Sequence, residues 1–127
     1  MVVATENLER SGLMSGSDQA YVVGQIQPAL EEITISEFFA RTVSRYPDRE
    51  ACIFCQSGER WTWSQLSQKV DQLAAGLLAL GVYKGDRVGI WSPNKPEWVL
   101  AQFATARIGV ILVNINPAYR RAELKYA

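Results

Sequence analysis

The sequence contains no histidine among its 127 residues. It therefore lacks the side chain most often used for proton transfer near neutral pH, which is also the commonest metal ligand. It also lacks both glycine-rich phosphate-binding patterns, G-x-G-x-x-G and G-x-x-x-x-G-K-S/T. Residues 81–86 contain two glycines, but we interpret these as a helix end and a turn rather than a phosphate cradle. Any chemistry in this chain would need other groups.

The chain has no excess of charge of either sign and no long apolar run. Thirteen Lys and Arg residues balance thirteen Asp and Glu residues, which argues against nucleic acid or an anionic membrane as a partner. No apolar stretch approaches the roughly 18 residues of a transmembrane helix. Near the start, Glu6, Glu9 and Asp18 interrupt the chain where a signal or transit peptide would lie. We therefore expect a cytoplasmic protein without a transmembrane segment.

The two cysteines, Cys52 and Cys55, form a C-x-x-C pattern within an expected strand. On a strand, positions three apart point to opposite faces, and a zinc site would need two further ligands. We therefore favour a structural role over a redox or metal pair. The four tryptophans are likewise interpreted as core residues rather than as a surface that stacks on a ligand ring.

Residues 1–33 are interpreted as a leader, mobile at the start and extended near the domain, and residues 34–127 as an incomplete domain. Two capping boxes, beginning at Thr34 and Thr62, predict the starts of two helices. Pro47 ends the first helix and Gly81 the second. Between the helices, residues 51–55 and 60–63 are expected to form an antiparallel hairpin.

The second half predicts a parallel βαβ unit. Its strands are residues 87–91 and 110–115, joined by a helix over residues 96–108 that Gly109 terminates. The last strand is apolar enough to be covered on both faces. A further helical pattern begins at residue 121, so the domain looks unfinished. The fold class is therefore α/β, with a parallel βαβ unit and a small antiparallel hairpin.

Two loops are candidate ligand contacts, because ligands of open α/β sheets lie beyond the carboxyl ends of the strands. These loops are residues 92–94 and 116–117. Ser, Asn and Pro are also the residues that helix caps and turns require, and we favour that structural role. The neighbouring charges at Asp86 and Arg87, and at Lys95 and Glu97, are interpreted as solvated.

The order of several short phrases resembles the start of the adenylate-forming superfamily, which includes acyl-CoA synthetases, aryl-CoA ligases and luciferases. The resemblance covers about three-quarters of the chain, from residue 35 to 127. The phrases are ARTVSRYPDREA at 40–51, WTWSQL at 61–66, LGVYKGDRVGI at 80–90, SPN at 92–94 and NINP at 114–117. Residues 98–100 and 116–119 look closest to the medium- and long-chain fatty-acid branch.

The resemblance implies a partial N-terminal subdomain of the adenylate-forming fold, within a fatty-acid CoA ligase. Such an enzyme uses ATP, with Mg²⁺, to form an acyl adenylate, and transfers the acyl group to CoA. The phosphate loop, Mg²⁺-binding Glu, ribose-binding Asp and catalytic Lys of the family would all follow Ala127, so no catalytic, cofactor-binding or metal residue is assigned here. We expect this part alone to be an inactive scaffold, and a homodimer is one expected assembly.

Two alternatives remain open at this point. One is a stand-alone protein-interaction module derived from such an enzyme, which would bind another protein through the face that the missing part normally contacts. The other is a small nucleotide-binding protein that uses the loop at residues 92–94, which the lack of a glycine-rich cradle disfavours.

Overall fold

The computed structural model describes Gly24 and residues 27–126. The chain divides into two units, Met1–Glu31 and Glu32–Ala127, and every helix and strand of the described residues lies in the second. The predicted leader falls largely outside the described residues and stays a prediction. The fold is described below for the second unit.

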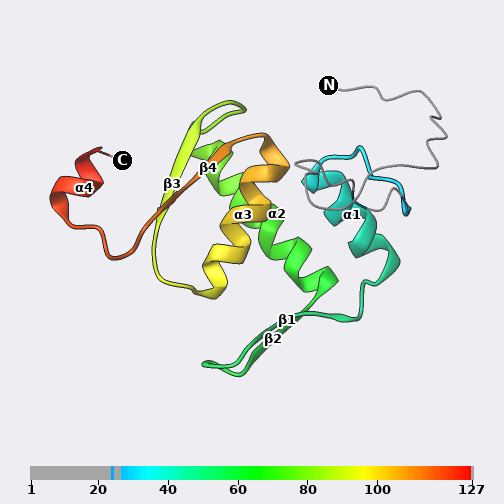
Figure 1. Ribbon diagram of the computed structural model, residues 1–127. Coiled ribbons are helices and arrows are strands. Elements are labelled where there is room, and N and C mark those ends of the chain that lie inside the picture. The colour runs from blue at the N-terminus through cyan, green and yellow to red at the C-terminus, as the bar shows by residue number, and fades with distance from the viewer. Residues whose placement is uncertain (1–23, 25–26, 127) are drawn as a thin grey trace, which may run out of the picture. The chain divides into compact units, whose positions relative to one another are not determined.

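The second unit contains four helices and four strands (Figure 1). In chain order they are α1 (Ile35–Arg45), β1 (Glu50–Phe54), β2 (Glu59–Thr62), α2 (Trp63–Ala79), β3 (Arg87–Trp91), α3 (Pro96–Ile108), β4 (Ile111–Ile115) and α4 (Arg121–Tyr126). Their types and order confirm the α/β fold class predicted from the sequence.

Both predicted capping boxes are present at the starts of α1 and α2. The Glu37 amide donates to the Thr34 hydroxyl at 3.2 Å, and the Thr34 amide donates to the Glu37 carboxylate at 2.8 Å. The Gln65 amide likewise donates to the Thr62 hydroxyl at 3.2 Å, and the Thr62 amide to the Gln65 side chain at 2.9 Å. Each box satisfies amides that the first helical turn leaves without partners, which is why the two helices begin at these points.

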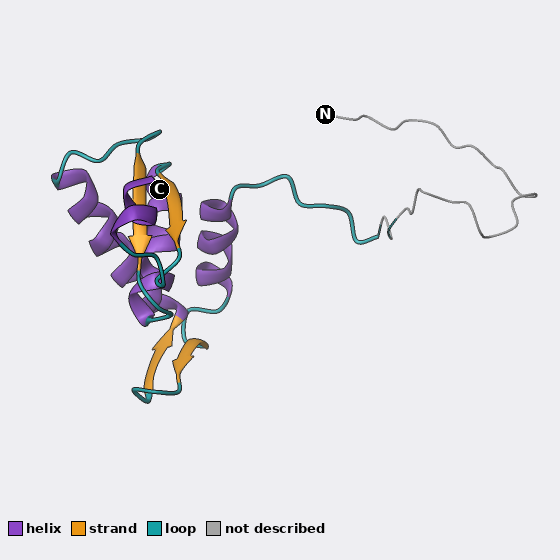
Figure 2. Cartoon of the chain, turned by 60° about the vertical axis from the view of Figure 1, so that its left-hand side comes forward, coloured by secondary structure: helices purple, strands orange, loops and turns teal. Residues whose placement is uncertain are grey.

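Strands β1 and β2 form the predicted antiparallel hairpin, which projects beyond the helices in Figure 2. Gly58 lies in the turn with a φ of 72°, a backbone conformation that is free of steric strain for glycine but unfavourable for most other residues. The pairing is irregular between Glu50 and Cys52. Trp61, near the end of β2, packs into the core close to the start of α2.

Strands β3 and β4 pair in parallel, with Arg87 opposite Ile111 and Trp91 opposite Ile115. Helix α3 connects them and ends at Gly109, whose φ of 72° is the left-handed cap that the sequence predicts. Figure 1 shows α3 between this sheet and α2. This arrangement confirms the parallel βαβ unit.

The prediction that β4 is covered on both faces is wrong for the described residues. The side chain of Ile111 is 47% exposed, and Trp91, on the same face of the neighbouring strand β3, is 50% exposed. The physical reason is the size of the sheet: among the described residues it has two strands, and α3 covers one of its faces. Strand β4 therefore carries more apolar side chains than the described residues bury.

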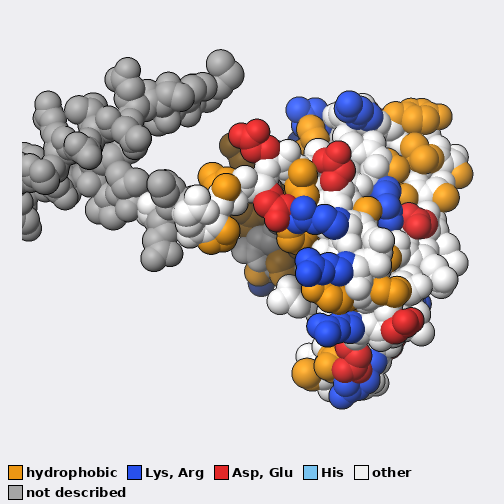
Figure 3. Space-filling view, turned by 90° about the vertical axis from the view of Figure 1, so that its right-hand side faces the viewer, with side chains coloured by type: hydrophobic (Ala, Val, Ile, Leu, Met, Phe, Trp, Pro, Cys, Tyr) orange, Lys and Arg blue, Asp and Glu red, His pale blue; other side chains and the backbone are white. Residues whose placement is uncertain are grey.

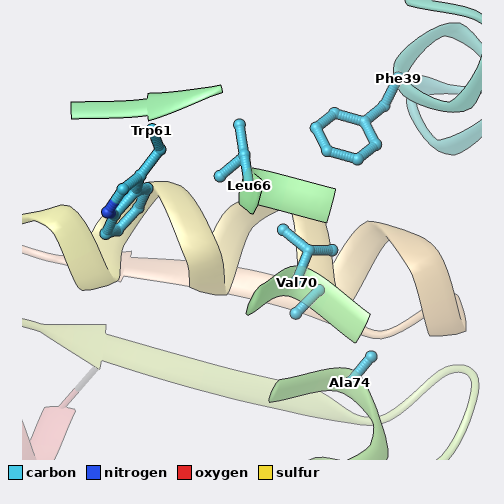
Figure 4. Close-up of a cluster of buried hydrophobic side chains, with 6 residues drawn as sticks. Phe39, Trp61, Leu66, Val70 and Ala74 are labelled. Carbon is cyan, nitrogen blue, oxygen red and sulfur yellow. The ribbon is translucent and has the colours of Figure 1, made fainter. Parts of the chain in front are cut away.

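The core lies where α1, α2, α3 and the hairpin meet (Figure 4). Its buried members are Phe39, Trp61, Leu66, Val70, Ala74 and Ala104. Ala104 is fully buried, since a small side chain at this point of α3 lets the neighbouring helix approach closely.

The apolar side chains that recur at helical spacing along α1 and α2 are only partly buried. In α2, Leu66 is 1% exposed whereas Leu80, just beyond the helix end, is 81% exposed. In α1, Phe39 is buried whereas Ile35 and Phe38 are about half exposed. Periodicity identified the correct faces of both helices, but the described residues cover only part of each face.

Arg107, in the last turn of α3, contacts both α2 and α1. Its guanidinium forms an ion pair with Asp71 of α2 at 3.0 Å, donates to the Ser67 hydroxyl at 3.2 Å, and lies 5.5 Å from the ring centre of Phe39 in α1. The Nε atom is buried and has no hydrogen-bond partner among the described residues. Arg107 therefore contributes packing as well as charge to the core boundary.

No helix among residues 27–126 is both long and apolar enough to span a bilayer.

Candidate functional site

The two loops selected from the sequence leave the same edge of the parallel sheet. Trp91 and Ile115 are register partners and are the last residues of β3 and β4. The loops that begin at Ser92 and Asn116 therefore start next to each other. This is the edge at which ligands of open α/β sheets bind.

The loop after β3 is held by a side chain of the helix that follows it. The indole nitrogen of Trp98, in the first turn of α3, donates to the backbone carbonyl of Ser92 at 3.2 Å. The Ser92 hydroxyl donates to the carbonyl of Pro93 at 2.9 Å. Pro93 and Asn94 form a bend that leads into the helix.

The loop at residues 92–94 has the turn role that was favoured for it, and it supplies no side-chain cap to α3. The N-cap residue is Lys95, which makes no side-chain capping hydrogen bond, and Pro96 occupies the first helical position. Proline favours that position because its φ is already helical and its missing N–H would have no partner there. The start of α3 is therefore determined by Pro96 rather than by a side-chain cap.

The loop after β4 is a turn organised by Asn116. Its side-chain oxygen accepts from the Ala118 amide at 2.9 Å, and its backbone carbonyl accepts from the Tyr119 amide at 3.0 Å. These bonds confirm the turn role predicted for Asn116.

A groove of 710 Å³ lies between the hairpin and the start of α3. Asn94, Lys95, Glu97 and Trp98 line it on the α3 side. The hairpin side contributes Ile53, Phe54, Cys55, Gln56, Ser57 and Glu59. The groove thus combines apolar walls with amide, hydroxyl, carboxylate and ammonium groups that could orient a ligand.

This groove was not predicted from the sequence. The loop containing Asn94 was a candidate ligand contact but the hairpin turn was not, because the two segments are about forty residues apart in the chain. Only their packing brings them together, and no motif links them. The position of Asn94 directly after a parallel strand indicated the α3 side of the groove and gave no information on the hairpin side.

The segment at residues 81–86 forms a turn, as predicted. Gly81 and Gly85 have φ values of 81° and 93°. The carboxylate of Asp86 accepts from the Tyr83 amide at 2.8 Å, and the Gly85 amide donates to the carbonyl of Gly109 at 3.0 Å. The glycines thus serve the turn and its contact with the end of α3.

The two cysteines are free and differ in their surroundings. Cys55 is exposed, whereas Cys52 is half-buried, and burial raises the pKa of the Cys52 thiol. Residues 27–126 contain no group of three or more His, Cys, Asp or Glu side chains that could hold a metal ion.

The tryptophans do not all fill the core. Trp61 is 5% exposed, and its indole donates to the Glu59 carboxylate at 2.6 Å. Trp91, at the end of β3, is 50% exposed, so the prediction of a core role is wrong for this residue. It lies on the sheet that the described residues cover on one face only.

Figure 3 shows side chains of both charge signs interspersed over one face of the molecule. Pairs such as Arg60 and Glu50, whose charged atoms lie 2.7 Å apart at exposed positions, mix the signs locally. This face therefore presents mixed rather than single-sign charge to a partner.

Comparison with known proteins adds an independent line of evidence. The model of the family described as AMP-binding enzyme matches residues 39–127. The chain is 50% identical over 108 residues to "Medium-chain acyl-CoA ligase ACSF2, mitochondrial" of Danio rerio, covering 85% of this chain and 18% of that protein. It is 45% identical over 107 residues to the Homo sapiens protein of the same name, covering 84% and 17%.

Solved structures show the same fold. A Mycobacterium tuberculosis fatty acyl CoA synthetase matches with a TM-score of 0.70 and 27% identity, over 73% of this chain and 18% of that one. The N-terminal subdomain of Klebsiella oxytoca NpsA, in complex with anthranilyl-AMSN, matches with a TM-score of 0.69 and 28% identity, over 73% and 24%. The chain spans about a fifth of the length of the curated relatives it matches.

These relatives overturn the prediction of a cytoplasmic protein. The zebrafish, mouse and human relatives are all named mitochondrial. The prediction failed because the absence of an apolar run argues against membrane insertion and secretion but does not distinguish one aqueous compartment from another. The few acidic residues near the start are a weak signal against an import sequence.

Proposed function

Because the chain belongs to the AMP-binding enzyme family, we propose that it is the N-terminal part of an AMP-forming acyl-CoA ligase acting on medium- to long-chain fatty acids. The observation that carries this proposal is the 42–50% identity to medium-chain acyl-CoA ligases over most of this chain. The match of the fold to two solved relatives, with TM-scores of 0.69 and 0.70, supports it. The preference for fatty acids of this length rests on the names of the relatives.

The proposed reaction has two steps. A carboxylate oxygen of the fatty acid attacks the α-phosphorus of ATP, and the bond to pyrophosphate breaks, giving an acyl adenylate. The sulfur of CoA then attacks the acyl carbonyl, loses its proton, and displaces AMP. The partners of the whole enzyme are accordingly a fatty acid, ATP and CoA.

The described residues take no direct part in the chemical steps under this proposal. The family resemblance implies Mg²⁺, but residues 27–126 contain no acidic cluster suited to it, so we derive no step through the metal. The contribution of this part is a scaffold: α3 and the β3–β4 sheet position the loops after Trp91 and Ile115 at one edge. We accordingly propose that the 127-residue chain alone is inactive.

The test is to express the complete reading frame that contains these residues and to measure its products. With ATP, CoA and octanoate or palmitate, we expect acyl-CoA, AMP and pyrophosphate in equal amounts. Benzoate serves as a comparison acid, and the 127-residue chain alone should form no product. Formation of ADP instead of AMP, or no acyl-CoA from either fatty acid, would contradict the proposal.

A reading frame that stops directly after the codon for Ala127 would also contradict it. The chain would then be a short protein without ligase chemistry, and the protein-interaction module would become the leading explanation. Sedimentation of the complete protein checks whether it forms the homodimer that the family resemblance leads us to expect. Cell fractionation would test whether the protein has a mitochondrial location like that of the relatives.

A further inference from the structure

The backbone of the loop between β3 and α3 has few bonding groups of its own. Pro93 and Pro96 have no N–H to donate, and Lys95, the N-cap of α3, makes no side-chain capping bond. Within residues 27–126, the Ser92 hydroxyl donates to the adjacent Pro93 carbonyl at 2.9 Å. None of these local interactions joins the loop to the interior of α3.

The bond that joins the loop to the body of the domain comes from Trp98. Its indole nitrogen donates to the carbonyl of Ser92 at 3.2 Å, across six residues of chain. The Trp98 amide also donates to the carbonyl of Lys95 at 3.0 Å, which closes the first turn of α3. Trp98 thus holds both ends of the segment that contains Pro93 and Asn94.

Trp98 also lies beside the candidate ligand contact. It is half-buried and lines the same groove as Asn94 and Lys95. Ser92 follows Trp91 directly, so its carbonyl marks the carboxyl end of β3. A displacement of Ser92 would therefore move Asn94 relative to both the sheet edge and the groove.

We propose that Trp98 is a positioning residue: its indole N–H holds the loop at residues 92–94 in the geometry in which the loop contacts a substrate of the ligase. This inference rests on the proposed function. Trp98 acts through the loop and is not itself a catalytic residue. The tryptophan has two separable roles, since its ring fills the groove wall while its N–H fixes the Ser92 carbonyl.

The test is Trp98→Phe in the complete enzyme, because phenylalanine keeps an aromatic ring in the groove wall and removes the N–H. We expect the KM for at least one of the fatty acid, ATP and CoA to rise about threefold to tenfold, as expected for the loss of one hydrogen bond. The kcat should stay within about twofold, because the loss affects substrate binding rather than a chemical step. Trp63→Phe, at a core tryptophan packed against Phe39, is the matched control and should leave every KM unchanged.

A second variant separates loop positioning from general destabilisation. Asn94 is exposed, so Asn94→Ala should leave the unfolding temperature unchanged while raising the same KM. If Trp98 acts through the loop, the Asn94→Ala effect should be smaller in the Trp98→Phe background, since the two changes disturb one contact. Additive effects, or a KM change shared with Trp63→Phe, would overturn the inference.

The two proposals fail in different ways. If the unmodified complete enzyme forms no acyl-CoA, the proposed function fails and the inference falls with it. If the unmodified enzyme is active but Trp98→Phe leaves all three KM values unchanged, the inference alone fails and Trp98 is a packing residue.

Discussion

Replacing Leu66 by alanine tests whether the core lies where the structure places it. Leu66 is 1% exposed and belongs to the cluster that also contains Phe39, Trp61 and Val70. The change deletes three buried carbons, which corresponds to about 2.4 kcal/mol of lost transfer free energy at about 0.8 kcal/mol each. Incomplete collapse of the resulting cavity adds to this loss, so we expect about 3–5 kcal/mol of destabilisation.

The assay is urea unfolding of the 127-residue chain at low concentration, followed by circular dichroism and by tryptophan fluorescence. With a slope of about 1.5 kcal/mol per M, the expected loss lowers the unfolding midpoint by about 2 M or more. Leu80→Ala is the matched control, because Leu80 is 81% exposed and the same atoms are removed. Its effect should stay within about 0.5 kcal/mol.

The reasoning would be refuted by equal, small shifts for the two leucine variants at an unchanged slope. Such a result would mean that the N-terminal half of α2 is no better packed than its end. A changed slope for Leu66→Ala alone would instead indicate that the folded or unfolded ensemble had altered in compactness.

Three further predictions follow from local features. Gly109→Ala should destabilise the chain by about 1 kcal/mol, because φ at this position is 72°. Gly76→Ala lies inside α2 with open space around the added carbon, and it should stabilise the chain by about 0.5–1 kcal/mol. Thermal unfolding of the two variants compares these effects. Bonds from the Thr34 backbone amide and from the Thr34 hydroxyl lower the pKa of Glu37, so this cap stabilises the fold above the unfolded pKa and weakens as pH falls through the folded one. Thr34→Ala removes the hydroxyl bond and keeps the backbone bond, so the part of its cost that comes from the hydroxyl–carboxylate bond, measured by urea unfolding, should shrink in acid. The cost of Thr62→Ala, whose box uses a neutral glutamine, should not. Finally, because apolar side chains on one face of the parallel sheet are exposed, sedimentation velocity of the 127-residue chain should show association at high concentration; a monomer at all concentrations would contradict this.

The helix starts and stops were predictable because their causes are local. The capping boxes at Thr34 and Thr62 involve partners three residues away, and Gly109 ends α3 through its own backbone conformation. Pro96 carries a comparable local signal, because proline favours the first helical position, and the predicted start of α3 at residue 96 is confirmed.

The candidate site was only half predictable. The rule that ligands lie beyond the carboxyl ends of parallel strands selected the loops at Ser92 and Asn116, and the register of β3 and β4 places them side by side. The facing wall of the groove, formed by the hairpin turn around Ser57, carried no comparable signal. Its position depends on how the hairpin packs against α3.

The sequence by itself determined the type and order of the elements, since capping boxes, glycine stops and hydrophobic periodicity act within one or two turns. The order of its short phrases was also enough to identify the family. Only the tertiary structure decided that Leu66 is buried while Leu80 is exposed, that Trp98 reaches the Ser92 carbonyl, and that the hairpin closes a groove. Each of these depends on where a side chain lies relative to other elements, which repeating patterns in the chain do not encode.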